Sequence, residues 1–131
     1  MITEDVVAIS DVLARYALTL ELEDAAACGE LFTADATYRV GNNFYQGRGE
    51  IVSFLTRALN GVHHIGLPSI RVNGDEAVSN ANFIFIARPT HEVRCGWYQD
   101  KLKRNHGTWL ITDRHSTIMG REEGQTPREE K

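Results

Sequence analysis

The chain has 131 residues, a net charge of −4, and 42% hydrophobic and 24% charged residues. This length suits one domain with its own core, and the composition is that of an ordinary water-soluble protein. Without a basic stripe or a long apolar run, nucleic-acid and membrane binding are not expected. Cys28 and Cys95 lie outside any metal-binding spacing and are expected to be buried reduced thiols. With no signal peptide visible in residues 1–20, the predicted location is cytoplasmic.

The first 60 residues predict three helices and one short hairpin. The helices are expected at 3–22, 24–32 and 50–59, and the hairpin strands at 36–40 and 44–46. Apolar residues recur at three- and four-residue steps in the first helix, with Thr3 as its N-cap. Asp24 is expected to cap the second helix, and Asn60 with Gly61 to end the third. The first half of the chain is therefore predicted to be mainly helical.

The second half predicts long strands joined by tight turns. They are expected at 69–72, 77–87, 91–104 and 108–119, and Asn73 with Gly74 forms a hairpin signal between the first two. Residues 120–131 are rich in charge and are expected to form a flexible tail after a single domain at 1–119. Helices followed by hairpin-linked strands predict an α+β fold.

Two adjacent histidines begin the strand-rich half. In an extended segment His63 shares a face with Ile65 and Leu67, whereas His64 points to the opposite face. The pattern leaves open which of the two faces a pocket. A histidine among apolar neighbours can act as an acid or base, or it can be a core residue that hydrogen-bonds a backbone carbonyl.

Strand alternation indicates further pocket residues. Phe83 and Phe85 share a face with small residues nearer the start of their strand, which suits a tapering apolar pocket. The same face could instead form a subunit interface. His115 has the parity of Ile111 on the last strand and is the second candidate histidine. Arg114 is expected to be a salt-bridge partner.

Several blocks occur in an order that resembles a known family. They are Ser10–Asp24, Glu30–Tyr38, Gly47–Ile51, Val62–Ile65, Gly96–Asp100 and Gly107–Trp109. The series resembles the SnoaL-like branch of the nuclear-transport-factor-2-like superfamily, which includes polyketide cyclases, scytalone dehydratase and steroid isomerase. The resemblance implies a cone-shaped α+β barrel, in which about three N-terminal helices pack on a strongly curved, mostly antiparallel sheet. It also implies a homodimer or homotrimer.

The resemblance also implies roles for individual residues. In the dehydratase-like members a tyrosine and an aspartate near the end of the first helix work with a histidine on the first sheet strand. The matching positions here are Tyr16, Glu21 and His63, with glutamate in place of aspartate. The second histidine of scytalone dehydratase falls on Ala81. The family register points Tyr98 into the pocket.

These observations combine into one functional hypothesis and one alternative. The predicted catalytic residues are His63, Glu21 and Tyr16, and the predicted substrate-binding residues are Tyr98, Phe83, Tyr38, His115 and Leu67. Glu21 would orient the imidazole, and a tyrosine hydroxyl would donate to a developing oxyanion. The expected activity is a cofactor-independent dehydratase, isomerase or cyclase acting on a small, largely apolar oxygenated metabolite.

No metal or cofactor is expected, because adjacent strand histidines point apart and no phosphate-binding loop is visible. The alternative is a non-catalytic small-molecule binding or assembly module with the same fold. The missing second histidine and the glutamate at position 21 favour that alternative.

Overall fold

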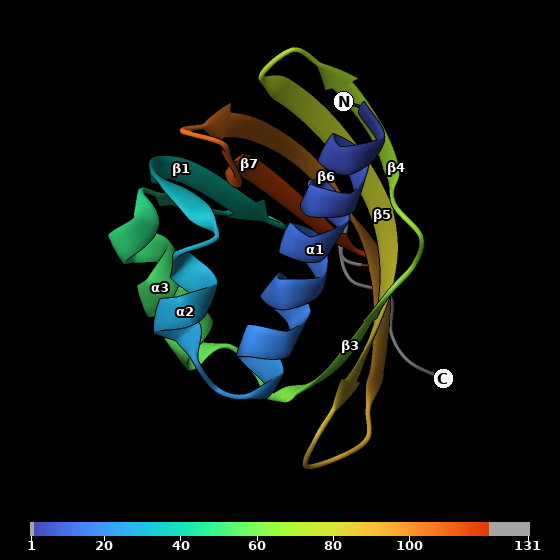
Figure 1. The fold of residues 1–131 in the computed structure, drawn as a ribbon. Coiled ribbons are helices and arrows are strands. Elements are labelled where there is room, and N and C mark those ends of the chain that lie inside the picture. The colour runs from blue at the N-terminus through green and yellow to red at the C-terminus, as the bar shows by residue number, and fades with distance from the viewer. Residues whose placement is uncertain (1, 121–131) are drawn as a thin grey trace.

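The computed structural model describes residues 2–120, and three helices pack on the concave side of a strongly curved sheet (Figure 1). The helices are α1 (Ile2–Glu21), α2 (Ala25–Gly29) and α3 (Arg48–Arg57). The strands are β1 (Phe32–Val40), β2 (Asn43–Gln46), β3 (Gly61–Ile65), β4 (Ser69–Asn73), β5 (Glu76–Ala87), β6 (Val93–Asn105) and β7 (Thr108–Ile118). A tail was expected at 120–131, and residues 121–131 of it lie outside the described residues.

The sheet is mixed but mostly antiparallel. Its strand order is β2-β1-β7-β6-β5-β3, and β4 also pairs with β5. Only the β1–β7 pair is parallel among the strands of the described chain. The sheet does not close on itself, and α1, α2 and α3 pack in series between β3 at one end and β1 near the other. The predicted α+β fold with helices on a curved sheet is confirmed.

The early elements differ from the sequence expectation mainly at their ends. The Asp24 Oδ1 atom accepts a hydrogen bond from the Ala27 main-chain N–H at 3.0 Å, so the predicted cap is correct. However, α2 ends at Gly29 rather than at 32, because Phe32 already belongs to β1 and pairs with Ile111 of β7. This long-range pairing outweighs the local helical preference.

The alternation of side chains along β7 changes phase at Thr112. Ile111 and Asp113 pair with consecutive residues of β6, so one extra residue is inserted between them. Such a bulge reverses which side chains point inward. The prediction that His115 shares the face of Ile111 is therefore wrong. Arg114 points into the core instead and is completely buried.

Candidate active site

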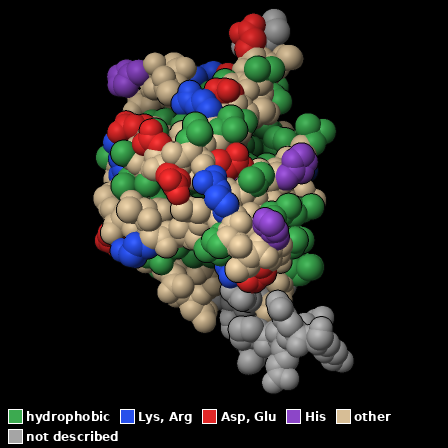
Figure 2. Space-filling model, turned by 90° about the horizontal axis from the view of Figure 1, so that it is seen from below, with side chains coloured by type: hydrophobic (Ala, Val, Ile, Leu, Met, Phe, Trp, Pro, Cys, Tyr) green, Lys and Arg blue, Asp and Glu red, His purple; other side chains and the backbone are tan. Residues whose placement is uncertain are grey.

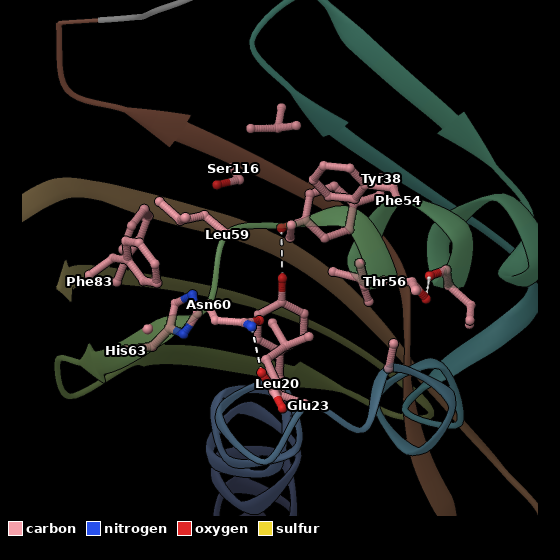
Figure 3. A pocket seen from close by; sticks show the side chains of 18 of the residues that line it. Leu20, Glu23, Tyr38, Phe54, Thr56, Leu59, Asn60, His63, Phe83 and Ser116 are labelled. Atoms are coloured by element: carbon pink, nitrogen blue, oxygen red, sulfur yellow. Dashed lines mark hydrogen bonds between the residues drawn. The ribbon is translucent and has the colours of Figure 1, made fainter. Parts of the chain in front are cut away.

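A cavity of about 530 Å³ lies between the helices and the concave face of the sheet. Figure 3 shows His63 and Phe83 on one side of the cavity, and Tyr38 with Phe54 on the other. Tyr16, Phe85 and Tyr98 complete an aromatic wall. A volume of this size accommodates a drug-sized organic molecule. The lining therefore suits a largely apolar ligand that carries a few polar groups.

The rim of the cavity is more polar than its wall. Glu23 follows α1, Asp24 caps α2, and Asn60 precedes β3; all three are exposed and line the cavity. The Asn60 side-chain amide donates to the Glu23 carboxylate at 2.5 Å, which joins two sides of the rim (Figure 3). On the face shown in Figure 2, acidic and basic side chains lie among apolar ones without a continuous basic patch in the described part of the chain.

His63 is the histidine that lines the cavity, whereas His64 is exposed. The His63 ring lies 4.7 Å from the Phe85 ring and 6.4 Å from the Tyr16 ring, centroid to centroid. Burial lowers the pKa of His63 to about 4, because it outweighs the opposing effect of the Glu21 carboxylate. The imidazole is thus neutral at pH 7. Its buried Nδ1 atom has no hydrogen-bond partner among residues 2–120.

Glu21 meets His63 through the main chain. Its Oε1 atom accepts a hydrogen bond from the His63 backbone N–H at 2.7 Å. Arg88 in turn donates from Nη2 to the Glu21 main-chain carbonyl at 3.0 Å. Glu21 itself does not belong to the cavity lining. The structure therefore brings the two predicted partners together, with Glu21 anchoring the strand that carries the imidazole.

Three tyrosines line the cavity. The Tyr16 and Tyr38 hydroxyls lie 2.8 Å apart and hydrogen-bond each other. The Tyr98 ring lies 5.8 Å from the Tyr16 ring and stacks on Phe83 at 4.5 Å. Burial raises the pKa of all three phenols, so they are protonated at neutral pH. Since one hydrogen suffices for the Tyr16–Tyr38 bond, the other stays available for a ligand.

The structure gathers five of the eight predicted site residues around one cavity. They are His63, Tyr16, Tyr38, Phe83 and Tyr98. Glu21 lies directly behind His63. Leu67 is 98% exposed, because β3 ends at Ile65 and its alternation does not reach position 67. His115 lies outside the cavity, where its Nδ1 atom is 3.1 Å from Nη2 of Arg39.

The expectation that Arg114 is a salt-bridge partner is confirmed, but sequence reasoning missed that the ion pair is buried beside this cavity and that its acid is Asp100. Arg114 donates from Nε and Nη2 to the two carboxylate oxygens of Asp100, at 2.7 and 2.9 Å. One signal in the sequence could have revealed the acid of this pair. Asp100 is two residues from Tyr98 on the same strand and therefore lies on the same, inward face of β6. A carboxylate on a core face requires a buried partner. Only the bulge at Thr112 identifies that partner as Arg114.

Within residues 2–120, no group of three or more His, Cys, Asp or Glu side chains is placed to hold a metal ion. No helix in that range has the length and apolar character needed to cross a membrane.

Cys28 is buried and Cys95 is half-buried, and both are free thiols. The expectation of two buried thiols is therefore correct for Cys28 only, because Cys95 lies near the start of β6 with its side chain partly open to solvent.

Comparison with known proteins agrees with this architecture. A protein of unknown function from Mycobacterium tuberculosis shares 23% identity at a TM-score of 0.81, over 87% of this chain and 71% of the other. An NTF2-like protein with a cystatin-like fold from Novosphingobium aromaticivorans shares 24% identity at a TM-score of 0.82, over 90% and 84%. A candidate scytalone dehydratase from that organism shares 21% identity at a TM-score of 0.79, over 100% and 94%.

At these identities the solved structures establish the fold alone. No curated protein matches the sequence significantly. The decisive comparison is with a family model for the SnoaL-like domain, which matches residues 1–115 and so spans every helix and nearly every strand. The chain belongs to the SnoaL-like domain family.

Proposed function

We propose that this chain is a cofactor-independent acid–base enzyme, a dehydratase or an isomerase or cyclase, that acts on a small, largely apolar oxygenated molecule. One observation carries the proposal. A neutral imidazole, His63, with a buried Nδ1 atom that has no hydrogen-bond partner among residues 2–120, lines the same cavity as Tyr16 and Tyr98. A base and hydrogen-bond donors facing one enclosed space are the minimum equipment for proton transfer at carbon.

The chemistry follows from these groups. His63 takes a proton from the carbon next to a carbonyl, and the electron pair moves onto the carbonyl oxygen to give an enolate. A tyrosine hydroxyl donates a hydrogen bond to that oxygen. The imidazolium then returns its proton to another carbon, which completes an isomerisation, or to a departing hydroxyl, which leaves as water. Because the pKa of His63 is about 4, its protonated form is more acidic than a free imidazolium and gives the proton back readily.

The family supports this proposal at a coarse level. One structural neighbour is a candidate scytalone dehydratase, and another is assigned as the β subunit of an aromatic-ring-hydroxylating dioxygenase. Those assignments belong to the neighbours, which resemble this chain in fold alone. They nevertheless favour a cavity that handles small organic molecules, and dehydration lies within the chemistry proposed for His63.

The first experiment uses a reaction that needs only a general base in an apolar pocket. 5-Nitrobenzisoxazole opens to a coloured nitrophenolate when a base removes its ring proton. We expect His63→Ala to lose about 10²-fold or more of the rate of the wild type. The wild-type rate should rise with pH and level off above about 4, the pKa of His63. His64→Ala is the matched control, because His64 is the exposed neighbour on the same strand. Equal rates for wild type and His63→Ala would contradict the proposal.

The second candidate function is a small-molecule binding module. It is favoured by the geometry of Glu21, which hydrogen-bonds the His63 main chain and so does not orient the imidazole. Under this reading 5-nitrobenzisoxazole binds the wild type and His63→Ala with similar affinity, and neither protein accelerates its opening. Affinity and rate measured on the same samples therefore separate the two functions.

A further inference from the structure

The ion pair of Arg114 and Asp100 has a placement that stability alone does not explain. The exposed fractions of the two side chains are 0% and 1%, and the pair is bidentate. A buried ion pair adds little stability compared with apolar side chains of equal volume, because both charges lose their hydration. The Nη1 atom of Arg114 is also buried and has no hydrogen-bond partner within residues 2–120. A fully buried charge with an unsatisfied donor calls for another role.

The guanidinium of Arg114 lies against the cavity wall. Its central carbon is 4.1 Å from the centre of the Tyr16 ring and 3.9 Å from that of the Tyr98 ring. Both rings line the cavity, whereas Arg114 does not. Stacking of a cation on two aromatic faces is favourable and is strongest where water is excluded. Arg114 therefore fixes the planes of the two rings from behind, while Asp100 fixes the guanidinium.

The charge of Arg114 also reaches the hydroxyls. At Tyr38 and Tyr98 burial raises the phenol pKa, but Arg114 lowers it by more than Asp100 raises it. The net field of the ion pair at these hydroxyls is thus positive. A positive field strengthens a hydroxyl as a hydrogen-bond donor. The cavity therefore presents neutral phenol donors on a wall with a cation behind it.

We propose that Arg114 is a positioning residue that directs the Tyr16 and Tyr98 hydroxyls toward one oxygen atom of the ligand, and that the cavity selects ligands whose oxygen is anionic, of the phenolate or enolate type. This inference deepens the proposed function by naming the charge of the bound oxygen. It rests on the same cavity and does not require His63 to act as a base. Asp100 belongs to the device because its two carboxylate oxygens hold the guanidinium in contact with both rings.

The test measures the ionisation of a bound phenol, with 4-nitrophenol as the probe because its anion absorbs at longer wavelength. In the wild type we expect the anion to bind about tenfold more tightly than the neutral phenol, which lowers the apparent pKa of the bound probe by about one unit. The neutral analogue 4-nitrotoluene reports apolar binding alone. The double variant Arg114→Met/Asp100→Leu removes both charges and keeps their volume. It should lose the tenfold preference while its affinity for 4-nitrotoluene changes by less than about twofold.

A matched control is available in Arg104. This arginine also lies on an aromatic ring, 5.1 Å from the centre of Trp109, and pairs with a carboxylate, Asp5, at 2.6 Å, but it does not line the cavity. Arg104→Met should keep the preference for the anion. Loss of the preference in Arg104→Met, or its persistence in the double variant, would overturn the proposal.

Two further variants cover the case in which the double variant does not fold. Tyr98→Phe keeps the ring and its stacking on Phe83 but removes the donor, so it should lose most of the preference for the anion. Arg114→Lys keeps the positive charge but lacks the planar guanidinium, so it should retain only part of the preference for the anion. An unchanged preference in Tyr98→Phe would refute the donor role. The failure of this proposal and that of the proposed function can be told apart, because anion binding is also measured in His63→Ala. A wild type that prefers the anion but does not accelerate the benzisoxazole reaction would refute the proposed function alone.

Discussion

The carboxylate of Glu21 accepts a hydrogen bond from the main-chain N–H of His63 at 2.7 Å. This contact joins the last residue of α1 to the strand at the end of the sheet, 42 positions later in the chain. The imidazole itself points into the cavity, with its Nδ1 atom unpaired among the described residues. Glu21 therefore acts on the ring through its charge and through the position of the backbone.

Replacing Glu21 by Gln tests that electrostatic effect. The amide oxygen of Gln can still accept the bond from the His63 N–H, so the strand should stay in place. Removing the negative charge removes the influence that raises the pKa of His63, and we expect that pKa to fall further below about 4. NMR titration of the histidine ring protons in both proteins measures the change. An unchanged pKa, or a wild-type value near 6.5, would show that the two groups are not coupled in a shielded cavity.

His63 should also make stability depend on pH in a defined window. Its folded pKa, about 4, lies below the unfolded value of 6.5, so the unfolded chain binds more protons between those values. Stability is then unaffected by this group above pH 6.5 and falls as the pH drops toward 4. The full effect is up to about 3 kcal/mol, from 1.36 kcal/mol per pKa unit.

The measurement is urea unfolding of wild type and His63→Gln at pH 7 and at pH 4.5. The wild type should lose more stability than the variant over this interval, because glutamine has no proton to gain. The remaining titratable groups are the same in both proteins, so their contributions to the loss of stability cancel in the comparison. Equal losses in the two proteins would mean that the His63 ring titrates as it does in water.

The Tyr16–Tyr38 hydroxyl pair should be energetically coupled. Tyr16→Phe leaves the Tyr38 hydroxyl without its partner in a buried site, and Tyr38→Phe does the reverse. We expect each single variant to lose about 1 kcal/mol of unfolding free energy or more, and the double variant to lose less than the sum. Chemical denaturation of the four proteins gives the coupling energy. A strictly additive cycle would show that the 2.8 Å contact does not contribute to stability.

Leu67 and His115 should be dispensable for ligand binding. Leu67 is almost fully exposed, and His115 lies on the outer side of β7 beside Arg39. Leu67→Ser should change stability by less than about 0.5 kcal/mol, as is usual for exposed positions. Neither Leu67→Ser nor His115→Ala should change the affinity for 4-nitrophenol by more than about twofold, whereas Tyr98→Phe should. Calorimetric titration of the three variants makes the comparison, and a clear loss in His115→Ala would restore that histidine to the site.

Local pattern was sufficient for much of the fold. Three-and-four-residue spacing located α1, and the Asp24 cap marked the start of α2. The family resemblance supplied the inward direction of Tyr98, whereas the Asn73–Gly74 turn and the alternation along β5 and β6 were correct from local pattern. These features depend on neighbours in the sequence, which is why periodicity and turn chemistry report them.

The sequence by itself determined that His63 and His64 lie on opposite faces of their strand and that Phe83 and Phe85 share a face of theirs. Only the tertiary structure decided that His63 and the two phenylalanines line one cavity, and what stands behind its wall. The bulge at Thr112 adds one residue to β7 and exchanges His115 for Arg114 on the inside. The Glu21 carboxylate reaches the His63 main chain only when α1 lies beside β3. Both results depend on register and packing between segments far apart in the chain, which strand alternation cannot encode because it repeats identically until an inserted residue shifts it.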